Sequence, residues 1–357
     1  MKELRIERVE KILVVMLGGI GDMILLLPAL QSLRDHSPRK RITLLIGEPN
    51  AEEIIKEQQL VDEVILYDRR KRKSLFEIIR FLMNMRKKKF DCAIVASGTH
   101  AFKGSLFTRL MGIPYRVGEN IDGVGFWYTV KVDYDSGMHE LDGALQLVRA
   151  IGVAMTAHSP VLTVAKADEV YVNRVLSEHG VQKTHVLIGI HPGSGYKEQR
   201  FKRWSKEKFA QLGDEISKRY NAQIILTGGP DEIDLVNDIA HRMQQRPIIA
   251  AGRMTIRQTT AIIKQCTLFI SNESGLAHIA TAVETPVVII VGATNLKKIG
   301  PRGKDITIVR KKLACSPCYD RGHVACEGID CMESITTEEV VAAVDKVLSV
   351  EKLPHVS

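Results

Sequence analysis

One acidic residue stands among glycines and apolar residues near the start of the chain. Asp22 follows Gly18, Gly19 and Gly21, and the apolar run 12-ILVVML-17 precedes them. Glycines at the end of a strand permit a tight turn and let backbone N–H groups approach a ligand closely. A carboxylate at this point could act as a general base, and it would equally suit the first turn of a helix, where the helix dipole favours an acid.

A second candidate region, 191-HPGSGYKEQRFKRW-204, combines glycines, a hydroxyl group and basic side chains. Backbone amides and the Ser194 hydroxyl would supply hydrogen-bond donors near Gly195, and Lys202 would supply positive charge. This combination suits a diphosphate. The alternative is a basic loop that only contacts solvent.

Two further turns carry polar residues at the start of a predicted helix. In the stretch LTGGPDEID, Asp231 could accept hydrogen bonds from a ribose or could cap the helix. In the stretch ISNESGLAH, Ser274 and Gly275 open a helix, so their N–H groups would face a ligand. His278 lies one turn further on. A lone histidine in a helix is usually structural. Because His278 lies beside this helix start, contact with a ligand is as well supported as a structural role.

Four cysteines lie close together near the end of the chain, with the spacing C-x2-C-x7-C-x4-C. They are Cys315, Cys318, Cys326 and Cys331. In a cytoplasmic protein such a cluster favours a thiolate metal site over disulfides, and tetrahedral thiolates suit zinc or iron. The alternatives are free thiols and, last, disulfides.

Short apolar runs and helical patterns alternate along the chain and would position these residues. Strands are predicted at 12–16, 42–46, 64–67 and 93–96, and helices at 23–36, 50–58, 74–88 and 139–151. After a linker-like stretch at 152–164, strands are predicted at 186–190, 223–228, 267–271 and 287–292, and helices at 206–220, 231–242, 256–264, 275–282 and 337–350. Such alternation indicates parallel sheets that are covered by helices on both faces.

We therefore predict an α/β protein with two Rossmann-like domains whose parallel sheets face an interdomain cleft. The first domain comprises residues 1–160, the second comprises residues 161–335 and includes the cysteine cluster, and residues 336–357 form a last helix and a tail. Ligands bind such folds at the carboxyl ends of the strands.

Composition narrows the class of partner. The net charge of +8 indicates an anionic partner, such as a nucleotide, a phosphorylated glycan, a membrane surface or a nucleic acid. Aromatic residues make up only 5% of the chain and no recognition motif is present, so we do not expect nucleic-acid binding. The charged N-terminus is unlike a secretory signal, and glycines and Asp22 interrupt the apolar run 12–30. We therefore expect a cytoplasmic protein.

Two basic tracts, 69-RRKRK-73 and 86-RKKK-89, flank the helical pattern at 74–85. They would form either a solvated face or a patch for an anionic acceptor. That acceptor could be a phosphorylated core sugar or the inner leaflet of the inner membrane.

Four of these stretches, taken in order, resemble glycosyltransferase family 9, the heptosyltransferases of lipopolysaccharide assembly. They are GGIGD followed by LLLPAL, HPGSG with KRW, the GGPDE turn, and SNESGLAH with TPVV. The resemblance runs from about Lys11 to Val347. No single element is specific, and the order and spacing of all four carry the resemblance.

The resemblance implies a GT-B fold with an N-terminal acceptor domain and a C-terminal donor domain. It implies inverting transfer of a heptose from ADP-heptose to a lipopolysaccharide inner-core acceptor. Asp22 would deprotonate the acceptor hydroxyl while the glycines before it keep the turn accessible, and Lys202 would stabilise the diphosphate. No metal or other cofactor is required for this chemistry.

Other residues match the family by position. Ser194 and its neighbour Gly195 match a site near the phosphates, and Asp231 matches an acid on the adenosine side. Ser274, Gly275 and His278 match a helix-start motif at the diphosphate and sugar. Some relatives carry an iron-binding finger, but many heptosyltransferases lack the four cysteines, so the cluster is not needed for the reaction.

Glu273 departs from the family pattern, which usually has Asp at this position. The longer side chain moves the charge by one methylene, so a different sugar or a shifted sugar pose would follow if this acid holds the sugar hydroxyls. Two other functions therefore stay open. One is a family member that uses another nucleotide sugar or another glycan or protein acceptor. The other is a non-catalytic nucleotide-sugar binder, although the presence of both Asp22 and Lys202 argues against it.

Overall fold

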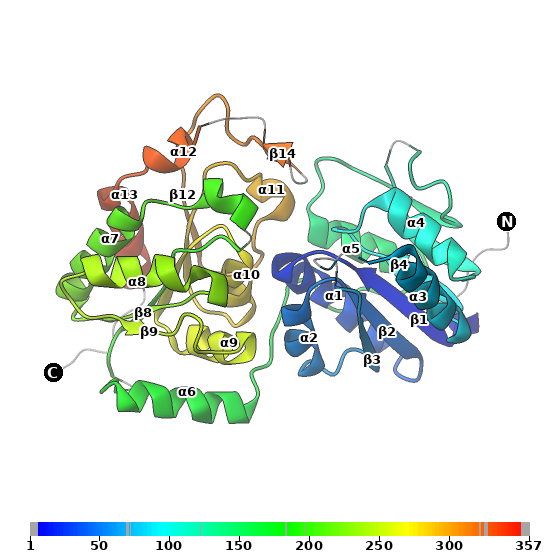
Figure 1. The fold of residues 1–357 in the computed structure, drawn as a ribbon, viewed down its shortest axis with the longest axis horizontal. Coiled ribbons are helices and arrows are strands. Elements are labelled where there is room, and N and C mark those ends of the chain that lie inside the picture. The colour runs from blue at the N-terminus through cyan, green and yellow to red at the C-terminus, as the bar shows by residue number, and fades with distance from the viewer. Residues whose placement is uncertain are drawn as a thin grey trace. The chain divides into compact units, whose positions relative to one another are not determined.

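The computed structural model describes residues 6–68, 71, 73–121, 123–182, 184–195, 197–320, 323–324 and 328–350. The chain divides into two compact units. The first unit consists of Met1–Val161 and Lys297–Ile299, and the second consists of Leu162–Leu296 and Gly300–Ser357. Each unit contains a six-stranded sheet with helices around it, and the colour runs from blue to green in the first and from green to red in the second (Figure 1).

The sheet of the first unit is parallel, with the strand order β3-β2-β1-β4-β5-β6. Its strands are β1 (Lys11–Met16), β2 (Arg41–Ile46), β3 (Glu63–Leu66), β4 (Cys92–Val95), β5 (Tyr115–Asn120) and β6 (Val130–Asp133). Its helices are the short 3-10 helix η1 (Ile6–Arg8) and α1 (Ile20–His36), α2 (Pro49–Lys56), α3 (Leu75–Lys87), α4 (Ala101–Leu110) and α5 (Glu140–Arg149). The strand order reverses between β1 and β4, and doubly wound sheets bind ligands at such a point.

Strand β1 lies at the centre of this sheet because it is apolar on both faces. Every residue after Lys11 is buried, and Val14 pairs with Leu44 on one side and with Ile94 on the other. Central parallel strands are continuous apolar runs for this reason. The four strands predicted for this half of the chain are confirmed to within one residue at each end.

Two strands and one α-helix of the first unit are missing from the sequence prediction, as is the short 3-10 helix η1. Strands β5 and β6 carry charged residues at positions that are not fully buried, so their apolar pattern is weak. Helix α4 has a glycine in its middle, because a Cβ on Gly104 would lie 2.6 Å from Val95 Cγ1. This glycine lets the helix approach β4 closely, but it weakens the helical pattern of the sequence.

The second unit has the same architecture, with the strand order β12-β11-β10-β7-β8-β9. Its parallel strands are β7 (Leu187–His191), β8 (Gln223–Leu226), β9 (Ile248–Ile249), β10 (Leu268–Asn272), β11 (Val287–Ile290) and β12 (Ile306–Val309). Its α-helices are α6 (Lys166–Glu178), α7 (Lys206–Tyr220), α8 (Ile233–Arg242), α9 (Ile256–Gln265), α10 (Gly275–Ala282), α12 (Asp330–Glu333) and α13 (Thr337–Val350). Shorter elements are η2 (Lys197–Lys202), η3 (Pro230–Glu232) and the antiparallel pair β13 (Tyr319–Asp320) and β14 (His323–Val324). The short helix α11 (Leu296–Ile299) belongs to the first unit except for Leu296. In the second unit the strand order reverses between β7 and β10.

Helices α7 and α13 contribute to the core of the second unit. Trp204 and Phe209 lie edge to face, with ring centroids 5.0 Å apart. Val340 and Leu348 of α13 are buried in the same apolar cluster. The predicted last helix has the predicted bounds, but it is part of this unit rather than a segment of its own, because its apolar face completes the core.

Sequence reasoning misses α6, β9 and β12. Helix α6 buries only Val172 and Leu176, β9 has two residues, and β12 is an edge strand that is not fully buried. Such elements leave little hydrophobic periodicity in the sequence. None of the helices in the described part of the chain has both the length and the hydropathy of a membrane span.

Candidate active site

Asp22 lies in the first turn of α1, directly after the central strand of the first unit. The chain leaves β1, passes through Gly18 and Gly19, and reaches Gly21 as the second residue of the helix. The backbone N–H of Gly19 donates a hydrogen bond of 2.7 Å to Asp22 Oδ2. One oxygen therefore serves the helix start, as the capping alternative predicts. The Asp22 side chain is nevertheless only half-buried.

Two glycines make room for the Asp22 carboxylate. A Cβ on Gly18 would lie 2.2 Å from Asp22 Oδ2, and a Cβ on Gly98 would lie 3.3 Å from Asp22 Cγ. Gly98 follows β4 and has a φ of +83°, which glycine adopts without strain. Because β1 and β4 are neighbours at the reversal of strand order, Asp22 lies at the edge where such sheets bind ligands. Sequence reasoning missed Gly98, although a glycine just after a predicted strand was a usable signal.

In the second unit, a buried carboxylate organises the loop after β7. Glu232 accepts hydrogen bonds from the backbone N–H groups of Ser194 (3.1 Å), Gly195 (3.4 Å) and Gly229 (3.0 Å). Arg203 adds an ion pair of 3.3 Å to the same side chain. The amides of Ser194 and Gly195 were predicted to supply donors to a diphosphate, but in the structure they donate to Glu232.

The Ser194 hydroxyl is also used inside the loop. It donates to the backbone carbonyl of Gln199 over 3.0 Å and accepts from Arg203 Nε over 3.1 Å. Burial lowers the pKa of Arg203, and the Glu232 carboxylate opposes this shift. Gly195 has a φ of +83° and therefore needs to be glycine for the turn. Ser194 and Gly195 thus shape the loop.

Asp231, the acid chosen from the sequence, is exposed, whereas the next residue is not. Glu232 is 4% exposed and makes the contacts described above. Sequence reasoning missed Glu232. The signal was its spacing, because Glu232 follows Gly229 by three residues, as Asp22 follows Gly19.

Lys202 and Glu273 form a buried ion pair at the carboxyl edge of the second sheet. Lys202 Nζ donates to Glu273 Oε2 over 2.8 Å, and the two side chains are 8% and 7% exposed. The Thr294 hydroxyl donates to the same oxygen over 2.8 Å. His278 Nε2 lies 4.0 Å from Glu273 Oε1, and the Lys202 ammonium lies 4.3 Å from the ring centroid of Tyr319. The structure therefore brings together Lys202 with Glu273 and His278, which come from a different stretch of the sequence. Thr294 and Tyr319 were not predicted and lie at the same place.

The surroundings of Glu273 decide its charge. Burial, the largest single effect, raises the pKa of Glu273, but the charge and hydrogen bond of Lys202 outweigh it together with His278 and the Thr294 hydroxyl. The pKa of Glu273 consequently lies below its ordinary value, so the side chain is a carboxylate at neutral pH. A ligand at this edge would meet a balanced pair of charges rather than a lone ammonium group.

Asn272, the last residue of β10, ties this edge to the loop after β7. Its side-chain N–H group donates to the carbonyls of Pro192 (2.8 Å) and Gly193 (3.1 Å), and its oxygen accepts from the backbone N–H of Trp204 (3.1 Å). Sequence reasoning missed this buried asparagine, which satisfies groups from two loops at once.

Helix α10 begins beside the ion pair. Ser274 precedes the helix with an extended backbone, and its hydroxyl lies 3.1 Å from the Ser271 hydroxyl without capping the helix. Gly275 is the first helical residue, and His278 is buried one turn later. The start of α10 therefore lies next to Glu273, as the sequence predicts.

The predicted metal ligands lie partly outside the described residues. Cys331 is 6% exposed and belongs to the apolar core of the second unit, Cys315 is exposed, and Cys318 is half-buried. Cys326 lies outside the described residues. Within the described ranges, no group of three or more Cys, His, Asp or Glu side chains is arranged to hold a metal ion.

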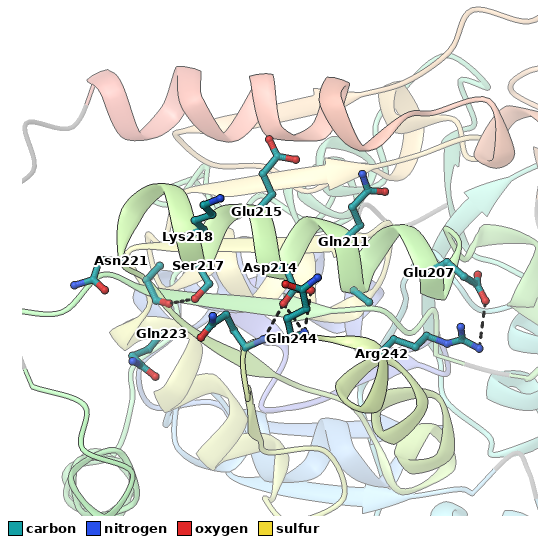
Figure 2. Close-up of a pocket in the computed structure, with 13 residues that line it drawn as sticks. Glu207, Gln211, Asp214, Glu215, Ser217, Lys218, Asn221, Gln223, Arg242 and Gln244 are labelled. Atoms are coloured by element: carbon teal, nitrogen blue, oxygen red, sulfur yellow. Dashed lines mark hydrogen bonds and ion pairs between the residues drawn. The ribbon is translucent and has the colours of Figure 1, made fainter.

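A surface depression of about 650 Å³ lies along α7 and the segment after α8 (Figure 2). The Asp214 carboxylate lies in it and accepts hydrogen bonds from the N–H groups of Gln244 and Gln245. None of the residues predicted from the sequence lines this depression, and its lining is mostly polar and exposed. We assign it no part in catalysis.

Comparison with solved structures identifies the fold of these two doubly wound units. A crystal structure of a family 9 glycosyltransferase from Veillonella parvula aligns with a TM-score of 0.79 at 23% identity, covering 98% of this chain and 99% of that one. The structure of the Escherichia coli ADP-heptose lipopolysaccharide heptosyltransferase II aligns with a TM-score of 0.75 at 20% identity, covering 96% and 99%. The fold is the GT-B fold of glycosyltransferases.

Sequence comparison then identifies the family. The profile of "Glycosyltransferase family 9 (heptosyltransferase)" matches residues 78–327, which is more than half of the chain. The chain therefore belongs to glycosyltransferase family 9 and is a glycosyltransferase. A lipopolysaccharide heptosyltransferase 3 of Escherichia coli is 28% identical in an alignment of 286 positions that covers 77% of this chain and 81% of the relative.

Proposed function

We propose that this enzyme transfers a heptose from ADP-heptose to a lipopolysaccharide inner-core acceptor, with inversion at the anomeric carbon. The names of its relatives support this donor and this class of acceptor. The observation that carries the proposal is the position of Asp22, half-buried between the loops after β1 and β4 where the strand order reverses. A carboxylate that is held at this edge and open to solvent can receive a proton from a bound hydroxyl.

Asp22 would be the general base. As the acceptor oxygen forms its bond to the anomeric carbon, the hydroxyl proton passes to the Asp22 carboxylate, and the bond from the anomeric carbon to the diphosphate breaks. The hydrogen bond from the Gly19 N–H fixes one carboxylate oxygen at 2.7 Å. The first unit would bind the acceptor, and residues 18, 19 and 21 would form the wall of that site.

The second unit would bind the donor. Lys202, together with the start of α10 at Ser274 and Gly275, would stabilise the negative charge that develops on the leaving ADP. The loop of Ser194 and Gly195 would lie against the diphosphate, and the exposed Asp231 would lie on the adenosine side.

Glu273 and His278 would contact the sugar. The Glu273 carboxylate holds the Lys202 ammonium in place before the donor binds, because the two atoms lie 2.8 Å apart. We propose that its second oxygen, which lies 4.0 Å from His278, accepts a hydrogen bond from a heptose hydroxyl. All of these steps use side chains and backbone groups of the chain itself. A zinc or iron ion at the four cysteines stays a separate prediction with no part in the transfer.

We further propose that the enzyme works in the cytoplasm, at the inner face of the inner membrane. A lipopolysaccharide core acceptor carries its own lipid anchor, so the acceptor hydroxyl would be presented at that surface.

Turnover of ADP-heptose with heptose-free lipopolysaccharide core tests the proposal. Wild-type protein should transfer heptose, and Asp22→Asn should reduce the rate at least about a hundredfold, because general-base catalysis contributes on that scale. ADP binding should be unchanged. Transfer that survives in the variant would displace Asp22 as the base.

A second candidate function is transfer of another sugar, or transfer to another glycan or to a protein. Glu273 supports it, because the family usually has the shorter Asp there and this side chain is fixed by Lys202 and Thr294. A donor screen distinguishes the two candidates. Release of nucleotide from a different donor, without turnover of ADP-heptose, would favour the second candidate.

A further inference from the structure

Helix α3 has two apolar faces, and only one of them packs into the first unit. Phe81, Leu82 and Met85 face the core, where Met85 is 2% exposed. The Phe81 ring lies 4.7 Å from the ring of Tyr67. This inner face is sufficient to attach the helix to the sheet.

The outer face of α3 carries four exposed apolar side chains, which we call the outer stripe. Leu75, Phe76, Ile79 and Met83 are 73%, 71%, 47% and 57% exposed. Leu75, Ile79 and Met83 are four residues apart, so they lie along one side of the helix, and Phe76 lies beside them. Single exposed apolar residues are ordinary, but a continuous row on one helix marks an interaction surface.

Positive charge surrounds the outer stripe. Arg80, Arg86 and Lys87 are exposed on the same helix. Helix α3 has one acidic residue, Glu77, in its first turn. Glu77 accepts hydrogen bonds there from the N–H (2.7 Å) and hydroxyl (2.9 Å) of Ser74. Of the basic tract 69–73 that the sequence analysis named, Lys71 and Lys73 are described and precede this end of the helix, and residues 69, 70 and 72 lie outside the described residues.

Helix α4 extends the same kind of surface. It packs against α3, and the two helices are drawn next to each other in Figure 1. Phe102 and Leu110 are 39% and 48% exposed, and Lys103 and Arg109 are exposed between them. Apolar and basic side chains are thus interspersed on both helices.

We propose that the outer stripe of α3, with the exposed residues of α4, docks the enzyme on an anionic lipid bilayer. The apolar side chains would enter the boundary between headgroups and acyl chains while the arginines and lysines contact lipid phosphates. A second copy of the chain fits this surface less well, because a two-fold dimer would bring the same basic residues together. The choice of a lipid bilayer as the partner rests on the location at the inner membrane that is part of the proposed function.

Flotation with vesicles tests the proposal without donor or acceptor. Wild-type protein should bind vesicles that contain phosphatidylglycerol at least about tenfold more than vesicles of phosphatidylcholine alone, and added salt should reduce the difference. Phe76→Ser combined with Met83→Ser should weaken binding to the anionic vesicles about tenfold. Arg80→Glu combined with Lys87→Glu should remove the preference for anionic lipid.

The matched control is Val161→Ser combined with Val170→Ser, which removes two side chains that are 66% and 58% exposed elsewhere in the chain. Its vesicle binding should equal that of the wild type. Equal binding by the wild type and the stripe variant would overturn the proposal, and so would equal binding to the two kinds of vesicle. A stripe variant that changes only the oligomeric state in solution would assign this face to a second copy of the chain.

The two proposals fail in different experiments. Transfer to a water-soluble, deacylated core should persist in the stripe variant, because the outer stripe is not in the catalytic site. Loss of vesicle binding with this transfer intact supports docking. Transfer that is absent in the wild type, together with normal vesicle binding, would overturn the proposed reaction and leave the docking surface in place.

Discussion

Both units place an acid three residues after a glycine at the carboxyl edge of a parallel sheet, but the two acids have different surroundings. The Gly19 N–H donates to Asp22 over 2.7 Å, and the Gly229 N–H donates to Glu232 over 3.0 Å. Asp22 is half-buried, whereas Glu232 is buried and also binds donors from the loop after β7. The same local arrangement therefore produces an accessible carboxylate in one unit and an internal anchor in the other.

The neighbouring loop makes the difference. In the first unit, the loop after β4 brings Gly98 against the acid, and glycine has no side chain to cover it. In the second unit, the loop after β7 brings two N–H groups, and Arg203 adds a charged donor. A buried carboxylate needs such partners, because desolvation without them is costly. The role of an acid at a strand end therefore depends on the adjacent strand as much as on its own turn.

Exchanging each acid for its amide should separate these two roles most strongly. Asp22→Asn should lower kcat by about 10²-fold to 10⁴-fold, because the amide cannot accept the proton. Its oxygen can still accept from the Gly19 N–H, so the thermal midpoint should stay close to that of the wild type. Glu232→Gln should instead lower stability, and kcat should fall less. Steady-state kinetics and thermal denaturation of both variants check this, and equal losses of kcat would remove the distinction.

Breaking the buried ion pair of Lys202 and Glu273 should have the next largest effect. Glu273→Gln leaves the Lys202 ammonium without its carboxylate, which should cost about 3 kcal/mol of unfolding free energy at neutral pH. Because the pKa of Glu273 lies below its ordinary value of 4.5, this stabilisation is complete above that pH and is lost as the pH falls through the folded-state pKa. The difference between wild type and variant, measured by urea unfolding, should shrink below about pH 4.5. A constant difference from neutral to acid pH would contradict it.

Adding one methyl group to a glycine tests the space around each acid. A Cβ on Gly193 would lie 1.9 Å from Glu232 Oε1, and a Cβ on Gly18 would lie 2.2 Å from Asp22 Oδ2. Gly193→Ala should cost about 1–3 kcal/mol of stability because the buried network must shift. Gly18→Ala should cost less stability, since Asp22 can move toward solvent, but it should lower kcat. Gly229→Ala is the matched control, because its Cβ would meet nothing within 4 Å.

The smallest expected effect is the difference in stability between serine variants of Cys331 and Cys315. Cys331→Ser should destabilise the protein by about 1–2 kcal/mol, because it puts a hydroxyl into the apolar core, whereas the exposed Cys315→Ser should change stability by less than about 0.5 kcal/mol. Metal analysis of protein purified without chelator accompanies the denaturation. Equal loss of zinc or iron in both variants would support the four-cysteine site. Less than about a tenth of an equivalent of metal in the wild type would rule it out.

The sequence is sufficient to predict the buried strands of both sheets and to suggest candidate residues at their edges. Central strands are continuous apolar runs, so β1 and β10 were predictable to within one residue. Asp22 could be proposed because it follows a predicted strand and a glycine turn, Lys202 because it lies in a basic stretch after a glycine loop, and Glu273 because it departs from the family pattern. Edge elements such as β6 and β12 were missed, since partial burial leaves no clear pattern.

Contacts between loops could not be predicted in the same way. That Glu232 rather than Asp231 turns inward depends on donors from a loop 37 and 38 residues earlier in the chain. The 2.8 Å contact of Lys202 with Glu273 joins residues 71 positions apart. Local sequence identifies which groups can take part in such contacts, but the pairing follows from how the strands are ordered.

The contribution of α13 to the core has a consequence for protein synthesis. Val340, Val344 and Leu348 fill the same apolar cluster as strands β7 and β10, which leave the ribosome much earlier. The second unit therefore cannot close its core until translation has passed this helix, whereas the sheet of the first unit is complete once Asp133 has emerged. Domains generally fold in the order of their synthesis. The nascent chain should thus carry the complete first sheet while the second unit is still incomplete and its apolar strands are exposed.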